Sequence, residues 1–250
     1  GLVQGEVSLT PIQSQFLASD TAEPHYFNQA MLLVVPEDLE VTALQAAFTA
    51  VLNQHDAFRL RYLLQEKIWC QSHQADFTPH QIIEDTLATP SDGLVAALEP
   101  RANYWQASLN LADGPLTRLV LFRTAAGTPT RLLWVIHHLI VDGVSWRILL
   151  DDLQTAYQQS RADEPIQLPP KSTSFKAWSE FLHTWQQSAT CAAETAHWQT
   201  LPQTLPALPL DHPDGRALLC DTAHHTLTLS QALTEQLLYR TASAYRTGIN

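Results

Sequence analysis

One stretch of the chain carries three local signals in a row, and together they restrict how it can fold. The apolar run Leu132–Ile136 has the composition of a buried strand and leads directly into His137-His138. Asp142-Gly143 then supplies a turn signal. After this turn, apolar residues recur at the spacing of one helical face: Trp146, Leu149, Leu150, Leu153 and Tyr157. The pattern predicts a strand, a turn and then a helix over residues 144–159.

The strand before the histidines has a predicted partner. Leu116–Phe122 is a second apolar run, and Gly127 and Pro129 lie in the segment that separates the two runs. Glycine and proline are typical of a hairpin turn. We therefore expect the two strands to pair as antiparallel neighbours.

Earlier segments alternate between helix and strand patterns. Thr10-Pro11-Ile12-Gln13 has a threonine at a helix N-cap, a proline at the first helical position and a glutamine three residues later, so it predicts a short helix through about Ser19. Phe27–Val35 predicts a strand that Pro36 closes. An amphipathic helix follows, with its apolar face formed by Val41, Leu44, Phe48, Val51 and Leu52.

Phe58–Leu63 alternates apolar and basic residues, which is the period of a half-buried strand. This alternation places Arg59 and Arg61 on one face, and Trp69 is expected on the hairpin partner. The proline-containing stretch 161–174 is interpreted as a linker, 175–200 as helical, and 230–250 as a further helix. We expect a mixed α/β architecture, with residues 1–170 as a first lobe and residues 171–250 as a linker and the beginning of a second lobe.

Composition excludes several classes of function. The 250 residues carry 14 Lys and Arg against 25 Asp and Glu, a formal net charge of −11, and no basic block, so nucleic acid and anionic membranes are poor partners. The apolar runs are far shorter than the roughly 20 residues that a membrane span needs. Cys70, Cys191 and Cys220 are far apart, which favours a reducing cytoplasm. The first residues have neither an initiator Met nor a signal-peptide pattern, and we interpret the chain as a piece of a longer protein.

The paired histidines are the strongest candidates for chemistry. Successive side chains of a strand point to opposite faces, so His138 shares a face with Trp134 and Ile136, and only one histidine can face a cleft. A neutral imidazole is a suitable proton acceptor near neutral pH. The alternative is that both histidines only pack or hydrogen-bond at the strand end. A metal site is disfavoured, because His137, His138 and Asp142 lack the helical spacing of metalloprotease ligands.

The motif His137-His138-x-x-x-Asp142-Gly143 resembles the signature of the condensation superfamily of non-ribosomal peptide synthetases. Val144 and Trp146 after it resemble the epimerization branch, because peptide-bond-forming members more often have a tryptophan directly after the glycine. Other stretches agree in the same order along the chain: Thr10–Phe16, His25–Gln29, His55–Arg61, Asp113–Leu116, Trp178–Trp198, Leu208–Asp211 and Ala244–Asn250.

This resemblance implies a chloramphenicol acetyltransferase-like fold with two lobes and a tunnel between them, of which this chain would hold the N-terminal lobe and the start of the second. A peptidyl carrier protein would deliver the substrate into the tunnel on its phosphopantetheine thioester, and no cofactor would be bound directly. His138 would be the catalytic base, supported by His137 and Gly143. Asp142 and Arg59 would form a buried ion pair. The residues alone suit Asp142 equally well as a helix N-cap, and they suit Trp146 as a core anchor of the helix.

The implied activity is inversion of the α-carbon of a thioester-bound aminoacyl or peptidyl residue, in concert with other modules of a parent synthetase. A glutamate of the second lobe, beyond Asn250, would act on the opposite face, so the isolated chain is expected to be incomplete. Two alternatives stay open. The chain could belong to a condensation domain that forms peptide bonds, with His138 assisting attack by an amine, or it could be a carrier-docking fragment without catalysis.

Overall fold

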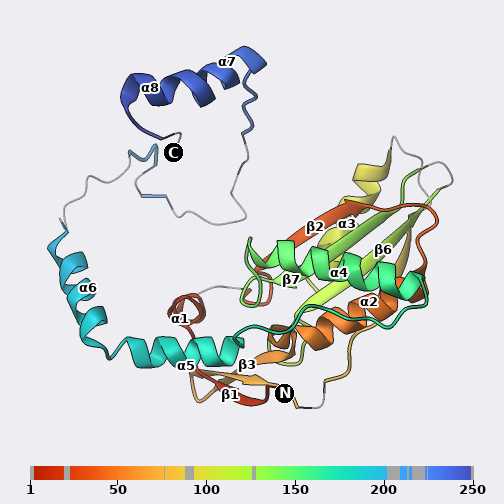
Figure 1. Ribbon diagram of the computed structural model, residues 1–250, viewed down its shortest axis with the longest axis horizontal. Coiled ribbons are helices and arrows are strands. Elements are labelled where there is room, and N and C mark those ends of the chain that lie inside the picture. The colour runs from red at the N-terminus through yellow and green to blue at the C-terminus, as the bar shows by residue number, and fades with distance from the viewer. Residues whose placement is uncertain are drawn as a thin grey trace. The chain divides into compact units, whose positions relative to one another are not determined.

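A computed structural model describes residues 3–19, 23–75, 77–87, 93–125, 128–201, 209–212, 214–215, 223 and 225–248 (Figure 1). They form two compact units, Gly1–Thr200 and Leu201–Asn250. The predicted turn residue Gly127, Cys220 and parts of the stretches 208–211 and 244–250 lie outside the described residues.

The first unit is built around a four-stranded sheet with the order β2-β7-β6-β5. Its strands are β2 (Asn28–Val34), β5 (Ile83–Leu87), β6 (Thr117–Thr124) and β7 (Arg131–His137). β7 pairs antiparallel with both neighbours, which confirms the predicted hairpin, whereas β5 runs parallel to β6. Because β7 lies in the centre and is buried on both faces, it consists of a nearly continuous apolar run.

Two helices, α2 (Val41–Gln54) and α4 (Ser145–Arg161), cover one face of this sheet, as Figure 1 shows. Phe48 of α2 and Trp146 of α4 both pack edge-on against Trp134 of β7, with ring centroids 6.1 and 5.6 Å apart. The opposite face packs on α3 (Leu94–Gln106) through Leu133 and Val135. The side chains of β7 therefore alternate between the two layers as its sequence predicts.

A smaller antiparallel sheet, with the order β1-β4-β3, lies beside the first. It comprises β1 (Gly5–Val7), β3 (Leu60–Gln65) and β4 (Ile68–His73), and Leu64 pairs with Trp69 as expected. Helix α1 (Pro11–Ala18) packs on this sheet. At its N-terminus the Thr10 backbone N–H donates to Gln13 Oε1 at 3.0 Å, which is part of the capping box that threonine and glutamine at this spacing predict.

The arginine segment differs from its prediction. Residues Asp56–Arg59 form a 3₁₀ turn, so the strand begins only at Leu60, and Arg59 is not on the strand at all. Arg59 and Arg61 are both buried instead of forming a half-exposed face. The strand predicted over Phe58–Leu63 is therefore correct only from Leu60 onward.

The remaining elements complete the two units. Residues 162–174 form neither helix nor strand, as expected of a linker, and α5 (Phe175–Trp185) then contacts the smaller sheet beside β1, where Lys176 Nζ donates to the Gln4 carbonyl at 3.0 Å. Helix α6 (Ala189–Thr200) has no buried residue. The second unit contains α7 (Gln231–Gln236), a π-helical segment (Leu237–Thr241) and α8 (Ala242–Tyr245). The lobe boundary near residue 170 stays a prediction.

Among the described residues, no helix has both the length and the apolar character that crossing a bilayer demands.

Candidate active site

His137 is a buried structural residue. Its Nε2 donates to the Pro24 carbonyl at 2.8 Å, and its Nδ1 accepts from the Leu139 N–H at 3.2 Å, so both ring nitrogens are engaged in one tautomer. Burial lowers the pKa of His137 to about 4, so the ring is neutral at physiological pH. It therefore has no nitrogen left for chemistry.

His138 follows the end of β7 and is only half-buried. Its Nδ1 is 2.8 Å from the Val141 carbonyl oxygen, which can only accept, so Nδ1 carries the proton and donates. The neutral ring then keeps a lone pair on Nε2. Phe27 stacks against the ring with centroids 5.0 Å apart and an interplanar angle of 20°. The arrangement holds an imidazole whose Nε2 can accept a proton.

Gln29 and Trp146 approach the same ring. Gln29 Nε2 is 3.3 Å from His138 Nε2, and Gln29 Oε1 accepts from Trp146 Nε1 at 2.7 Å. Gln29 lies opposite Ile136 in the pairing of β2 with β7, one position from the histidines. The sequence gives Gln29 no role by itself, and the signal that could have found it is its position in the stretch His25–Gln29, which matches the family. Trp146 is buried, as expected of a core anchor.

A cavity of about 330 Å³ opens beside His138. Apolar side chains of α1 and of the segment before β2 form most of its wall, together with Leu139, and the lining residues are Ile12, Gln13, Gln15, Phe16, Ser19, Phe27, His138 and Leu139. Gln13 anchors this wall, since its Nε2 donates to Tyr62 Oη at 3.0 Å and to the Leu139 carbonyl at 3.2 Å. The imidazole therefore faces a small, mainly apolar space.

The expected ion pair between Asp142 and Arg59 is wrong in this structure. Asp142 is exposed, and its Oδ1 accepts from the Ser145 N–H at 2.8 Å and from Ser145 Oγ at 2.6 Å, a contact of the turn before α4, whose N-cap is Val144. These hydrogen bonds lower the pKa of Asp142. Gly143 is also exposed, and a Cβ added to it would meet nothing within 4 Å.

Arg59 pairs with Asp56 of its own 3₁₀ turn, and Lys171 Nζ is 2.9 Å from the same carboxylate. Burial alone would raise the pKa of Asp56, but the hydrogen bonds from Lys171 and Arg59 bring it below its usual value. The buried Arg59 therefore pairs with Asp56 of its own turn and not with Asp142.

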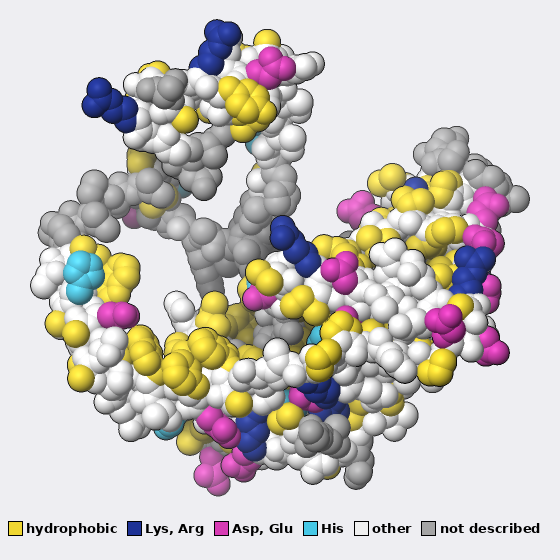
Figure 2. Space-filling model, in the orientation of Figure 1, with side chains coloured by type: hydrophobic (Ala, Val, Ile, Leu, Met, Phe, Trp, Pro, Cys, Tyr) yellow, Lys and Arg dark blue, Asp and Glu magenta, His cyan; other side chains and the backbone are white. Residues whose placement is uncertain are grey.

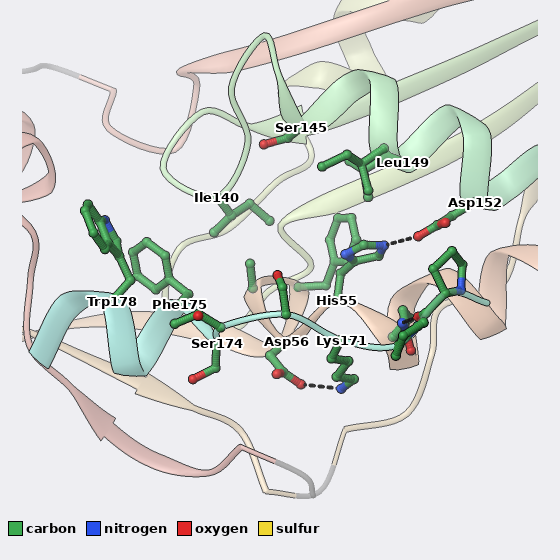
Figure 3. A pocket seen from close by; sticks show the side chains of 18 residues that line it. His55, Asp56, Ile140, Ser145, Leu149, Asp152, Lys171, Ser174, Phe175 and Trp178 are labelled. Atoms are coloured by element: carbon green, nitrogen blue, oxygen red, sulfur yellow. Dashed lines mark hydrogen bonds and ion pairs between the residues drawn. The ribbon is translucent and has the colours of Figure 1, made fainter. Parts of the chain in front are cut away.

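A second cavity of about 470 Å³ borders the loop after β7 and the first turn of α4 (Figure 3). Ile140 and Ser145 line it, whereas their neighbours His138 and Leu139 line the first cavity. Figure 3 shows two polar contacts in its wall, the hydrogen bond between His55 Nε2 and Asp152 Oδ2 at 2.7 Å and the ion pair of Lys171 with Asp56. Trp178 and Phe175 of α5 lie at one end of this second cavity (Figure 3). Sequence reasoning did not anticipate this second cavity, because its residues come from four separate segments.

Hydrophobic side chains also gather along α5 on the outside of the first unit (Figure 2). Trp178 and Phe181 stack there with ring centroids 5.5 Å apart, and both are exposed.

The chain resembles known proteins over nearly its whole length. A family model described as "Condensation domain" matches residues 3–250. The chain is 41% identical over 256 residues to chondramide synthase of Chondromyces crocatus and 41% identical over 252 residues to a linear gramicidin synthase of Brevibacillus parabrevis. All of the chain is matched, but it spans only 6% and 5% of these two relatives.

Among solved structures, the epimerization domain from the third module of tyrocidine synthetase B superposes with a TM-score of 0.87 and 33% identity, over 100% of this chain and 56% of that one. The starter condensation domain of rhizomide synthetase superposes with a TM-score of 0.68 and 21% identity, over 81% of this chain and 49% of that one. This second likeness concerns the fold alone.

Proposed function

Because the chain belongs to the condensation-domain family, with the chloramphenicol acetyltransferase-like fold of that family, we propose that it is the N-terminal part of an epimerization domain in a non-ribosomal peptide synthetase. The domain would invert the α-carbon of an aminoacyl or peptidyl residue held as a thioester on the phosphopantetheine of a peptidyl carrier protein. The likeness to a solved epimerization domain, at 33% identity over the whole chain, carries this proposal. The widely spaced cysteines favour a cytoplasmic location.

His138 is the proposed base. His138 lines the cavity of about 330 Å³, and the hydrogen bond from Gln29 to its Nε2 must open before that unprotonated nitrogen can take a proton from a substrate there. The thioester acidifies the α-hydrogen, Nε2 removes this proton, and the electron pair passes to the thioester oxygen as an enolate. Return of a proton to the opposite face completes the inversion, and the group that delivers it would belong to the part of the domain outside this chain.

A condensation domain is the second candidate function. The matching family model has that description, and the starter condensation domain of rhizomide synthetase has the same fold. In that case Nε2 of His138 would assist attack of an acceptor amine on a donor thioester instead of removing an α-hydrogen.

The test uses the complete two-lobed domain and an L-aminoacyl carrier thioester in deuterated water, with the mass and chirality of the released acid as readouts. Wild type should incorporate deuterium and give a mixture of L and D product. His138→Ala should lose roughly two to four orders of magnitude in rate, the contribution of a general base. His197→Ala, at an exposed histidine of α6, is the matched control and should exchange at the wild-type rate. Absence of exchange in wild type, with peptide bond formation once an acceptor carrier is added, would favour condensation.

A further inference from the structure

Three side chains from three elements form a hydrogen-bonded series that ends at the proposed base. Trp146 comes from the first turn of α4, Gln29 from β2, and His138 from the loop after β7. We propose that Gln29 and Trp146 are positioning residues that hold His138 in the tautomer with Nε2 unprotonated. This inference rests on the proposed function only for its catalytic consequence, because the tautomer itself is a property of the structure.

The chemistry of the three side chains determines which atom donates and which accepts in each hydrogen bond of the series. An indole N–H can only donate, so the Gln29 atom 2.7 Å from Trp146 Nε1 must be the amide oxygen. The amide nitrogen of Gln29 then faces His138 Nε2 at 3.3 Å, and it too can only donate. His138 Nε2 must therefore accept from Gln29. A proton on Nε2 would set two donors against each other.

The opposite side of the ring gives the same answer independently. The Val141 carbonyl, 2.8 Å from Nδ1, requires a proton on that nitrogen. Two contacts on two ring nitrogens thus select one neutral tautomer, the one that can remove a proton with Nε2. A histidine held by one contact alone would sample both tautomers and present the reactive lone pair for only part of the time.

The series is anchored in the core at its far end. Trp146 packs edge-on against Trp134, whose Nε1 donates to Thr117 Oγ1 at 2.9 Å, and Thr117 Oγ1 donates to the Val135 carbonyl at 2.9 Å. These side chains are buried, so the indole of Trp146 is held in a fixed orientation. Gln29 is not among the residues that line the cavity of about 330 Å³, and its hydrogen bond to His138 Nε2 must open when that nitrogen removes a proton.

Two substitutions separate this role from simple packing. Gln29→Glu keeps the shape of the side chain but replaces the amide donor with an acceptor, which would draw a proton onto Nε2 of His138. Trp146→Phe keeps an aromatic ring against Trp134 but removes the indole donor. The Gln29 amide can then rotate by 180° and present its oxygen instead of its nitrogen to His138. Gln154→Glu, at an exposed position of α4, introduces the same charge change and serves as the control.

The first readout is ¹⁵N NMR of histidine-labelled two-lobed domain, in which the His138 signals are identified by their loss in His138→Ala. Wild type should give an unprotonated Nε2 and a protonated Nδ1. Gln29→Glu should shift the Nε2 signal to that of a protonated nitrogen, and Trp146→Phe should give an intermediate, averaged signal. Unchanged His138 signals in both folded variants would overturn the inference, and the Trp146→Phe result decides alone if Gln29→Glu does not fold.

The second readout is α-hydrogen exchange. Gln29→Glu should lower kcat by roughly 100-fold and Trp146→Phe by about tenfold, with KM nearly unchanged, because base catalysis is lost and substrate contacts are not. The Gln154→Glu control should match wild type. Wild-type kcat in both variants would overturn the catalytic part of the inference. If the variants change the tautomer of His138 as expected but the wild-type domain never exchanges the α-hydrogen, the proposed epimerization is refuted and the positioning role remains.

Discussion

Adjacent residues of one motif have different hydrogen-bond partners, and the different roles that we propose for them follow from this. His137 uses both ring nitrogens on backbone groups, whereas His138 uses only Nδ1 on the backbone. Strand alternation predicts from the sequence that one histidine alone can face a cavity, and it places His138 with Trp134 correctly. The partners that fix each tautomer, Pro24 and Val141, could not be predicted, because they lie in irregular segments without a periodic pattern.

Two buried histidines should make the stability of the fold depend on pH. Burial lowers the pKa of His73 and of His137 to about 4 in the folded chain, below the value of 6.5 expected when unfolded. Between pH 6.5 and 4 the unfolded chain binds protons that the folded chain does not, so the free energy of unfolding falls as pH falls. Each histidine contributes a slope of up to about 1.4 kcal/mol per pH unit. Urea unfolding at several pH values from 7.5 to 5 measures this slope.

His73→Leu tests the contribution of one site. His73 is buried on β4, and neither of its ring nitrogens has a hydrogen-bond partner among the described residues, so leucine replaces it without the loss of a hydrogen bond. The variant should be less sensitive to acid than wild type, while His183→Leu, at an exposed position of α5, should keep the wild-type slope. An equally steep slope in His73→Leu would show that this site does not titrate as described.

The buried arginine gives a second prediction at the scale of single residues. Arg59 is 2% exposed and pairs with Asp56, so Asp56→Ala would leave a buried charge without its partner and should cost about 3–5 kcal/mol of unfolding free energy. Asp142→Ala removes only the hydrogen bonds to Ser145 in the exposed turn before α4 and should cost about 1 kcal/mol. Urea midpoints of the two variants compare these costs. A larger loss of unfolding free energy in Asp142→Ala than in Asp56→Ala would contradict the pairing of Arg59 with Asp56 and favour the pair with Asp142 that the family resemblance implies.

Among the elements, those with a strong local period were predictable and those specified by distant contacts were not. α2, α4, β6 and β7 carry clear helical or strand patterns and lie where the sequence places them. β5 and α3 were not predicted, since β5 holds Glu84 and Asp85 and α3 contains Pro100, which local rules count against a strand and a helix. These two elements depend on each other through a polar contact that no local pattern reveals.

That contact is testable. Asp85 is buried on β5 and accepts from Arg101 Nε at 2.9 Å, Arg101 Nη2 at 2.8 Å and Trp105 Nε1 at 2.9 Å, all from α3. Asp85→Ala should lower the free energy of unfolding by about 1–3 kcal/mol, because the Trp105 N–H loses its acceptor. A double-mutant cycle with Arg101→Ala should give a coupling energy above about 0.5 kcal/mol. Additive losses in the cycle would mean that the pair does not hold β5 to α3.

At the scale of the whole molecule, the two units differ in how much apolar surface they bury. The first unit contains three clusters of buried hydrophobic residues around its two sheets. In the second unit no described residue is buried, and Leu233, Leu237, Leu238 and Tyr239 are exposed on its short helices. Helices of this length are marginal in water without packing. The described part of the second unit therefore has the apolar residues of a folded element without a buried core among them.

Hydrogen exchange should separate the two units in the 250-residue chain. Amides of β6 and β7 lie in the centre of the main sheet and should exchange only through global unfolding, whereas those of α7 and α8 should exchange close to the rate of an unstructured peptide. The solved epimerization domain is matched over only 56% of its length, so a complete domain supplies further chain that could cover these helices. Their amides should then become protected at least tenfold in a two-lobed protein. Equal and strong protection of α7 and β7 in the 250-residue chain would show that the second unit folds without that additional chain.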